Sequence, residues 1–113
     1  MKKINDTKSK ILSILDDDNF KSFIFDTGDD IDESSFEYCG SNESSNLFEV
    51  INVIQDEVMK GAYYDFRGYI ELTYLNNNLI LKWESEENEL QTIWMINDDS
   101  IKIIRSNYPL NRL

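Results

Sequence analysis

Hydrophobic side chains in the middle of the chain recur with the spacing of an α-helix. Between residues 46 and 60, a single helical face would carry Leu47, Ile51, Ile54 and Val58. Asn46 followed by Glu49 has the pattern of a capping box at the start of this segment. Lys60 and the glycine after it form a typical C-terminal signal. The pattern predicts the main helix of the domain over residues 46–60.

A shorter helix is predicted near the N-terminus, over residues 7–15. Its apolar face would consist of Ile11, Leu12, Ile14 and Leu15. Either Asp6 or Thr7 can cap its first turn. Three consecutive aspartates, beginning with Asp16, follow its last turn. Because acids are unfavourable at the C-terminal end of the helix dipole, we expect the helix to end before them.

The other hydrophobic stretches have the short length or the alternation of β-strands. Segments with that character are 20–25, 36–39, 67–75, 79–84 and 90–96. The first two would form a hairpin, and residues 101–107 fit either a strand or a helix. The prediction is an α+β fold in which an antiparallel sheet of three to five strands packs against the 46–60 helix.

The length of 113 residues corresponds to a single domain covering residues 1–113. A hydrophobic fraction of 41% is enough for one modest core. No apolar run approaches the ~20 residues that span a bilayer, and the N-terminus lacks the apolar stretch of a signal peptide. A lone cysteine, Cys39, excludes an internal disulfide and favours a reducing cytoplasm.

Charge narrows the choice of partner. The chain has 22 acidic and 11 basic residues, for a net charge of −11. Such a protein repels phosphates and anionic lipids, so we expect neither nucleic acid nor a membrane as a direct partner. A basic protein would be attracted, above all by the nine acids between Asp16 and Glu37, where Lys21 alone is basic. The alternative is that the acidity only keeps the protein soluble.

The sequence contains little that predicts catalysis. It has no histidine, which removes the commonest general base and metal ligand. It has no glycine-rich phosphate loop, and Cys39 lacks a histidine to activate it. The acidic stretch that starts at Asp26 has Gly28 where a calcium loop requires an oxygen ligand. We therefore expect no enzyme, no cofactor and no metal, with a looser divalent site as the alternative at this stretch.

Acids that lie close to tyrosines are the candidate binding residues. Carboxylates accept charge-assisted hydrogen bonds from arginine and lysine, and aromatic rings accept cation–π contacts. The acidic candidates are Asp29, Asp30, Asp32, Glu33, Glu37, Glu84, Glu86 and Glu87, and the aromatic ones are Tyr38, Tyr63 and Tyr64. The alternative for the rings is ordinary packing in the core or at a strand edge.

With the acidic runs DDIDE at 29–33 and ESEENE at 84–89, the chain resembles the small acidic immunity proteins of bacterial toxin systems, including those of contact-dependent growth inhibition. The resemblance is one of size, acidity, single domain and absence of catalytic residues, and no motif carries it. It implies a cytoplasmic protein, more often a monomer than a dimer, that occludes the active site of one cationic toxin domain. A nuclease is the expected class, because its cleft must bind phosphate.

Two other functions fit the same sequence. Secretion chaperones are small acidic α+β dimers, and the apolar segment 47–59 would serve as their dimer helix. An acidic mimic of nucleic acid would share the electrostatics of an immunity protein and would bind a DNA-binding protein instead. The two differ in a measurable way, because only the chaperone requires a hydrophobic dimer interface.

Overall fold

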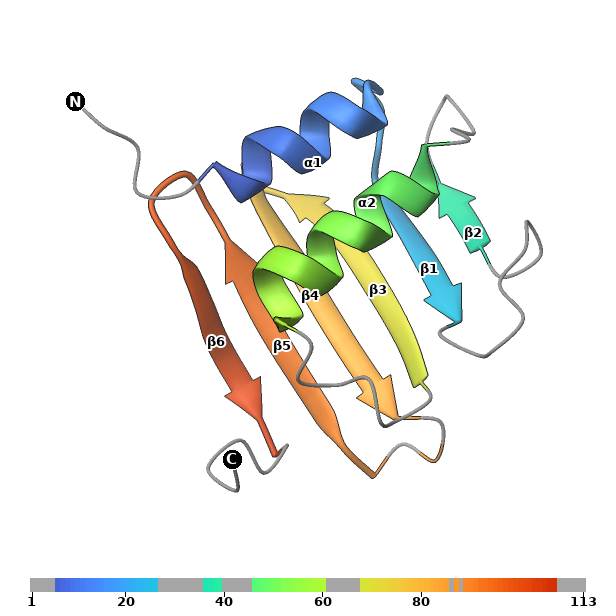
Figure 1. Cartoon of the computed structure of the whole chain (residues 1–113), viewed down its shortest axis with the longest axis vertical. Helices are drawn as coiled ribbons and strands as arrows, with labels where there is room; N and C mark the ends of the chain where they lie inside the picture. Colours follow the sequence, from blue (N-terminus) through green and yellow to red (C-terminus); the bar gives the residue numbers. More distant parts are fainter. Residues whose placement is uncertain are drawn as a thin grey trace.

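The computed structural model describes residues 6–26, 36–39, 46–60, 68–85, 87 and 89–107. They form an α+β domain, as predicted, with both helices on the same face of one antiparallel sheet (Figure 1). The helical elements are α1 (Thr7–Leu15), α2 (Leu47–Val53) and its continuation η2 (Ile54–Met59). The strands are β1 (Ser22–Asp26), β2 (Phe36–Cys39), β3 (Gly68–Leu75), β4 (Asn78–Ser85), β5 (Gln91–Ile96) and β6 (Ile101–Ser106).

The sheet has six strands in the order β2-β1-β3-β4-β5-β6, one more than the expected three to five. The predicted β1–β2 hairpin exists, but it also pairs through β1 with β3 and so extends the meander of β3 to β6. Residues 101–106, which fitted a strand or a helix, form the edge strand β6. The β1–β3 pairing joins segments more than 40 residues apart, so local pattern does not reveal it.

The core lies between the sheet and the two helices. The alternation along β3, β4 and β5 sends every second side chain into it, as the sequence predicts. The predicted helical face is also buried, since Leu47, Ile51, Ile54 and Val58 are at most 6% exposed. The largest side chain that is fully buried is Trp83, in the middle of the sheet on β4.

Both helices span the predicted residues, but their predicted side-chain caps are wrong. Asn46 makes no side-chain cap to α2; its amide instead donates to the Ile14 carbonyl oxygen at 3.3 Å and ties α2 to α1. Asp6 likewise makes no side-chain cap to α1. The helix ends before the aspartates as expected, with Asp16 in the left-handed conformation (φ 47°) and its N–H bonded to the Leu12 carbonyl.

The second half of the 47–59 helix is a π-helix, which the sequence did not indicate. Its i→i+5 pattern brings residues four and five apart to the same side, and accordingly Ile54, Val58 and Met59 are all buried. Glu57 then faces α1: Thr7 Oγ1 donates to Glu57 Oε1 at 2.8 Å and Lys10 Nζ to Oε2 at 2.7 Å. This polar contact links the two helices at the edge of the core.

The Glu57 contact predicts a loss of stability in acid. The hydrogen bond from Lys10, supported by the one from Thr7, holds the pKa of Glu57 below its ordinary value of 4.5. A carboxyl with a lowered pKa stabilises the fold fully above its unfolded pKa, and this contribution disappears as the pH falls through the folded pKa. Glu57→Gln should therefore lower stability at neutral pH and narrow the gap between neutral and acidic values in urea unfolding.

Asp56→Asn is the matched control for that experiment, because Asp56 is an exposed acid beside Glu57 in the same helix. It removes the same charge and should leave the pH dependence close to that of the wild type. Equal pH dependence of the Glu57→Gln and Asp56→Asn variants would show that the contact with α1 contributes nothing.

Candidate functional site

Two acidic segments of the chain are attached at the same end of the sheet. Residues 27–35 follow the end of β1, and the ESEENE turn at 84–89 follows the end of β4. The strand register places Asp26, Tyr69, Glu84 and Gln91 in one row across β1, β3, β4 and β5. Asp26 and Glu84 are thus two strand spacings, or about 10 Å, apart along this row. We call Asp26, Glu84, Glu87 and Glu89 the acid-rich end.

The β4–β5 turn at the acid-rich end is closed around a buried hydroxyl. Ser85 is 7% exposed, and its Oγ accepts hydrogen bonds from the backbone N–H groups of Glu89 (3.2 Å) and Leu90 (3.0 Å). The Ser85 N–H donates to the Leu90 carbonyl oxygen at 2.9 Å. Glu87 and Glu89 are exposed, and the backbone of Glu89 is held by its hydrogen bond to Ser85.

A side chain beyond the end of β6 holds the turn from the other side. Asn107 Oδ1 accepts from the Gln91 N–H at 2.6 Å, and Asn107 Nδ2 donates to the Glu89 carbonyl oxygen at 2.9 Å. The Gln91 side chain in turn donates to Glu84 Oε2 at 3.1 Å. The role of Asn107 was not predicted, because it depends on the pairing of β6 with β5, which the sequence left open.

Tyr69 is a further residue that the sequence analysis missed. It lies in β3 opposite both Asp26 and Glu84, and it is 41% exposed. The signal was present, because Tyr69 precedes Ile70 and therefore points to the outer face of an alternating strand. A tyrosine between two acidic positions has the character expected of the candidate rings.

The structure describes only part of the predicted site. Glu84 and Glu87 lie together at the acid-rich end, whereas Glu37 is exposed on the edge strand β2, three strand spacings, or about 14 Å, from β4. Tyr38 is in β2 opposite Phe23. The candidates outside the described residues are Asp29, Asp30, Asp32, Glu33, Tyr63, Tyr64 and Glu86.

The ion pairs between described residues leave the acid-rich end without a cation. They join Lys8 to Asp98, Lys10 to Asp6 and Glu57, and Lys82 to Glu71, at 2.7–3.9 Å. None of them involves the described side chains of the acid-rich end. Acids also lie elsewhere, after α1 and in the β5–β6 turn, so the negative charge is not confined to one surface.

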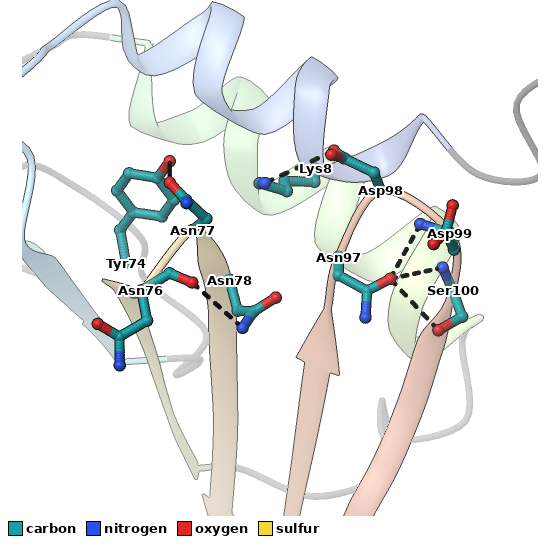
Figure 2. Close-up of polar contacts among 9 residues, drawn as sticks. All are labelled: Lys8, Tyr74, Asn76, Asn77, Asn78, Asn97, Asp98, Asp99 and Ser100. Carbon is teal, nitrogen blue, oxygen red and sulfur yellow. Dashed lines mark hydrogen bonds and ion pairs between the residues drawn. The ribbon is translucent and has the colours of Figure 1, made fainter.

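The opposite end of the sheet has a different polar character (Figure 2). Asn76 and Asn77 turn β3 into β4 with positive φ values of 52° and 66°, a conformation that asparagine tolerates. In the β5–β6 turn, Asn97 Oδ1 accepts from the backbone N–H groups two and three residues later, each at 2.9 Å. Lys8, a largely buried residue of α1, reaches Asp98 there at 3.5 Å. This end therefore neutralises part of its acidic charge within the chain.

Among the described residues, no three histidine, cysteine, aspartate or glutamate side chains are grouped so that they could hold a metal ion. In the same part of the chain, no helix has the length and apolar character needed to cross a membrane. A scan of protein-family models and searches of curated proteins and solved structures found no match to this chain.

Proposed function

We propose that this chain is an immunity protein that binds and neutralises a cationic toxin domain, a nuclease being the expected class, and that the acid-rich end is its binding surface. The observation that carries the proposal is the exposure of Glu87 and Glu89 beside Glu84, where the backbone N–H groups of Glu89 and Leu90 are hydrogen-bonded to Ser85 Oγ. The segment with DDIDE is attached at the same end of the sheet. The protein would act in the cytoplasm of the cell that it protects.

The arrangement suits recognition of arginine and lysine. Carboxylates accept strong charge-assisted hydrogen bonds from these side chains, and they would occupy the phosphate positions of a nuclease cleft. Because the backbone of Glu89 is already held by hydrogen bonds to Ser85 and Asn107, binding through Glu89 loses little backbone entropy. The net charge of −11 adds long-range attraction, which raises association rates up to ~10⁸–10⁹ M⁻¹s⁻¹ at low salt.

Neutralising the acid-rich end should weaken binding to the cognate cationic toxin domain, which the proposal expects to be encoded beside the gene of this chain. The test variant is Glu84→Gln/Glu87→Gln/Glu89→Gln, which keeps the oxygen that accepts from Gln91. We expect the dissociation constant for a catalytically inactive form of that toxin domain to rise about 10- to 100-fold, with a shallower salt dependence. Titration calorimetry at two salt concentrations measures both quantities.

The matched control is Asp16→Asn/Asp17→Asn/Asp18→Asn. It removes the same three charges next to the start of β1, away from the end of β1 that carries Asp26. We expect this control to change the dissociation constant by less than about threefold. Equal losses in both triple variants would mean that total charge, and not the acid-rich end, governs binding.

The chaperone alternative receives less support from the packing. The apolar residues of the 47–59 helix that would form a dimer helix are buried against the sheet, Leu47, Ile51 and Met59 being at most 6% exposed. Phe48, at 43%, is the large hydrophobic side chain that this helix exposes. One aromatic ring is a small surface compared with the area that stable interfaces bury.

A further inference from the structure

The face of the sheet opposite the helices has no described helix over it (Figure 1). Its side chains are those that alternate with the core positions, and they are half-buried or exposed. The register aligns six of them in one row across the sheet, which we call the central row: Glu37, Ile24, Glu71, Lys82, Ile93 and Arg105, from β2 to β6. Its order is acidic, apolar, acidic, basic, apolar, basic.

When this row is laid against the same row in reverse order, each acidic residue faces a basic one and each apolar residue faces an apolar one. Rotating a second copy by 180° about an axis parallel to the strands, between β3 and β4, lays its central row over the first in reverse order. Glu71 then meets Lys82 of the second copy, Ile24 meets Ile93, and Glu37 meets Arg105. A two-fold interface is always self-complementary in this way. We propose that the open sheet face binds the same face of a second copy of this chain.

The centre of the row is the strongest part of the match. Glu71 and Lys82 already pair across β3 and β4 at 3.6 Å, with 40% and 37% of their side chains exposed. In the dimer, two such pairs lie on each other and form a ring of four alternating charges. Packed sheets cross at about −30°, so residues at the ends of the central row would be displaced from their counterparts more than residues at its centre. The ring of four charges would therefore contribute most to the free energy of dimerisation.

Charge also selects this orientation over the other simple one. A two-fold axis perpendicular to the strands would superpose each strand on its own copy, so that Lys82 would face Lys82 and Glu71 would face Glu71. Like charges in contact oppose association. In one neighbouring row, Thr73 of one copy would face Ile80 of the other, and Ser22 would face Met95. In the other, Tyr69 would face Glu84 and Asp26 would face Gln91, so no like charges lie directly opposite in either row. The charge pattern of this face is thus complementary to the same face of a second copy.

The expected dimer is weak. Five strand spacings make the face about 24 Å wide, and six residues make it roughly 20 Å long. That footprint is at the low end for a specific interface, which buries about 800 Å² per partner, and the net charge of −11 on each copy opposes association. We therefore expect a dissociation constant on the order of 1–100 μM. The resemblance to immunity proteins favours a monomer. The sequence alone does not show which outward side chains share a row, so it does not indicate this interface.

Two single charge reversals test the proposal by sedimentation velocity. Glu71→Lys and Lys82→Glu each place like charges in the central ring, so each alone should weaken the dimer at least about tenfold. In an equimolar mixture, the lysine pair of the first variant meets the glutamate pair of the second. The mixture should therefore form a heterodimer at concentrations at which each variant alone is monomeric. Circular dichroism confirms that both variants remain folded.

Several outcomes would overturn the proposal. The proposal is wrong if the wild-type protein stays monomeric up to about 1 mM. It is also wrong if a mixture of the two variants fails to associate. Phe48→Asp is the matched control on the helix side of the molecule. If Phe48→Asp dissociates the dimer and the two sheet-face variants do not, the copies associate through the helices and the open sheet face is not the interface.

Discussion

Replacing Trp83 by alanine is expected to lower the free energy of unfolding by about 3–5 kcal/mol, the largest effect that we predict for a single substitution. Trp83 is fully buried on the central strand β4, opposite Ile70 on β3 and Thr92 on β5. Truncation leaves a cavity where three strands and the helical layer meet, and the surrounding strands cannot all close it. Since domains of this size are stable by only about 5–15 kcal/mol, much of the total would be lost.

Urea unfolding followed by circular dichroism measures this loss. Tyr69→Ala is the matched control, because it also truncates an aromatic ring in the sheet, but on the outer face, where Tyr69 is 41% exposed. We expect it to cost less than about 1 kcal/mol. A Trp83→Ala variant as stable as Tyr69→Ala would contradict the position of the core.

Replacing Gly68 by alanine should destabilise the fold by about 1–3 kcal/mol. Gly68 begins β3 opposite Ser85, and a Cβ atom there would collide with the Glu84 carbonyl oxygen and lie 3.1 Å from the Ser85 Cα. Both obstacles are backbone, so one strand must move. Where room exists, a glycine-to-alanine change stabilises by about 0.4–1 kcal/mol through the unfolded chain, so the sign of the effect is diagnostic.

The Gly68→Ala variant should also disturb the acid-rich end. Amide chemical shifts of residues 84–91 should change in NMR spectra, and the affinity for the cationic toxin domain should fall with them. Thr73→Ala, in the same strand and on the outer face, is the control and should change neither. A Gly68→Ala protein with wild-type stability and unchanged shifts would show that β4 is not held close to β3 at this point.

Local periodicity predicted the elements well because side-chain spacing is a local property. The three-to-four-residue spacing that runs from Leu47 through Val58 predicted both the helix and its buried face. The alternation in β3 and β4 likewise separated most of the buried side chains from the outward ones. The sequence did not indicate which of several possible hydrogen-bond partners a polar side chain would contact. Asn46 has the pattern of a cap, yet its amide donates to Ile14 of another helix.

The candidate site was predicted in composition but not in geometry. The ESEENE run indicated an acidic turn, and Glu84 and Glu87 do lie together at one end of the sheet. Its closure around Ser85 and its tether to Asn107 depend on long-range strand pairing, which residue type alone does not specify. The position of Tyr69 between two acidic positions depends on the same register.

The two proposed surfaces overlap at one row of the sheet: Tyr69 and Glu84 lie on the outer face beside the central row, whereas Glu87 and Glu89 lie beyond the end of β4. An axis parallel to the strands leaves the ends of the strands uncovered and places both acid-rich ends at the same end of the dimer. Each Glu87 and Glu89 would remain exposed. Dimerisation would therefore cover Glu84 but leave Glu87 and Glu89 accessible. Binding to a basic partner should be measured at concentrations below the dissociation constant of the dimer, so that each proposal keeps its own test.

Hydrogen–deuterium exchange with and without the cationic toxin domain would locate the binding surface on this protein. If the acid-rich end is the binding surface, the amides of residues 84–91 should become protected in the complex, and those of residues 95–101 should not. The second segment is a fair comparison, because its turn also carries two acids, Asp98 and Asp99. Protection of residues 95–101 with none at residues 84–91 would place the binding surface at the other end of the sheet and would rule out the acid-rich end.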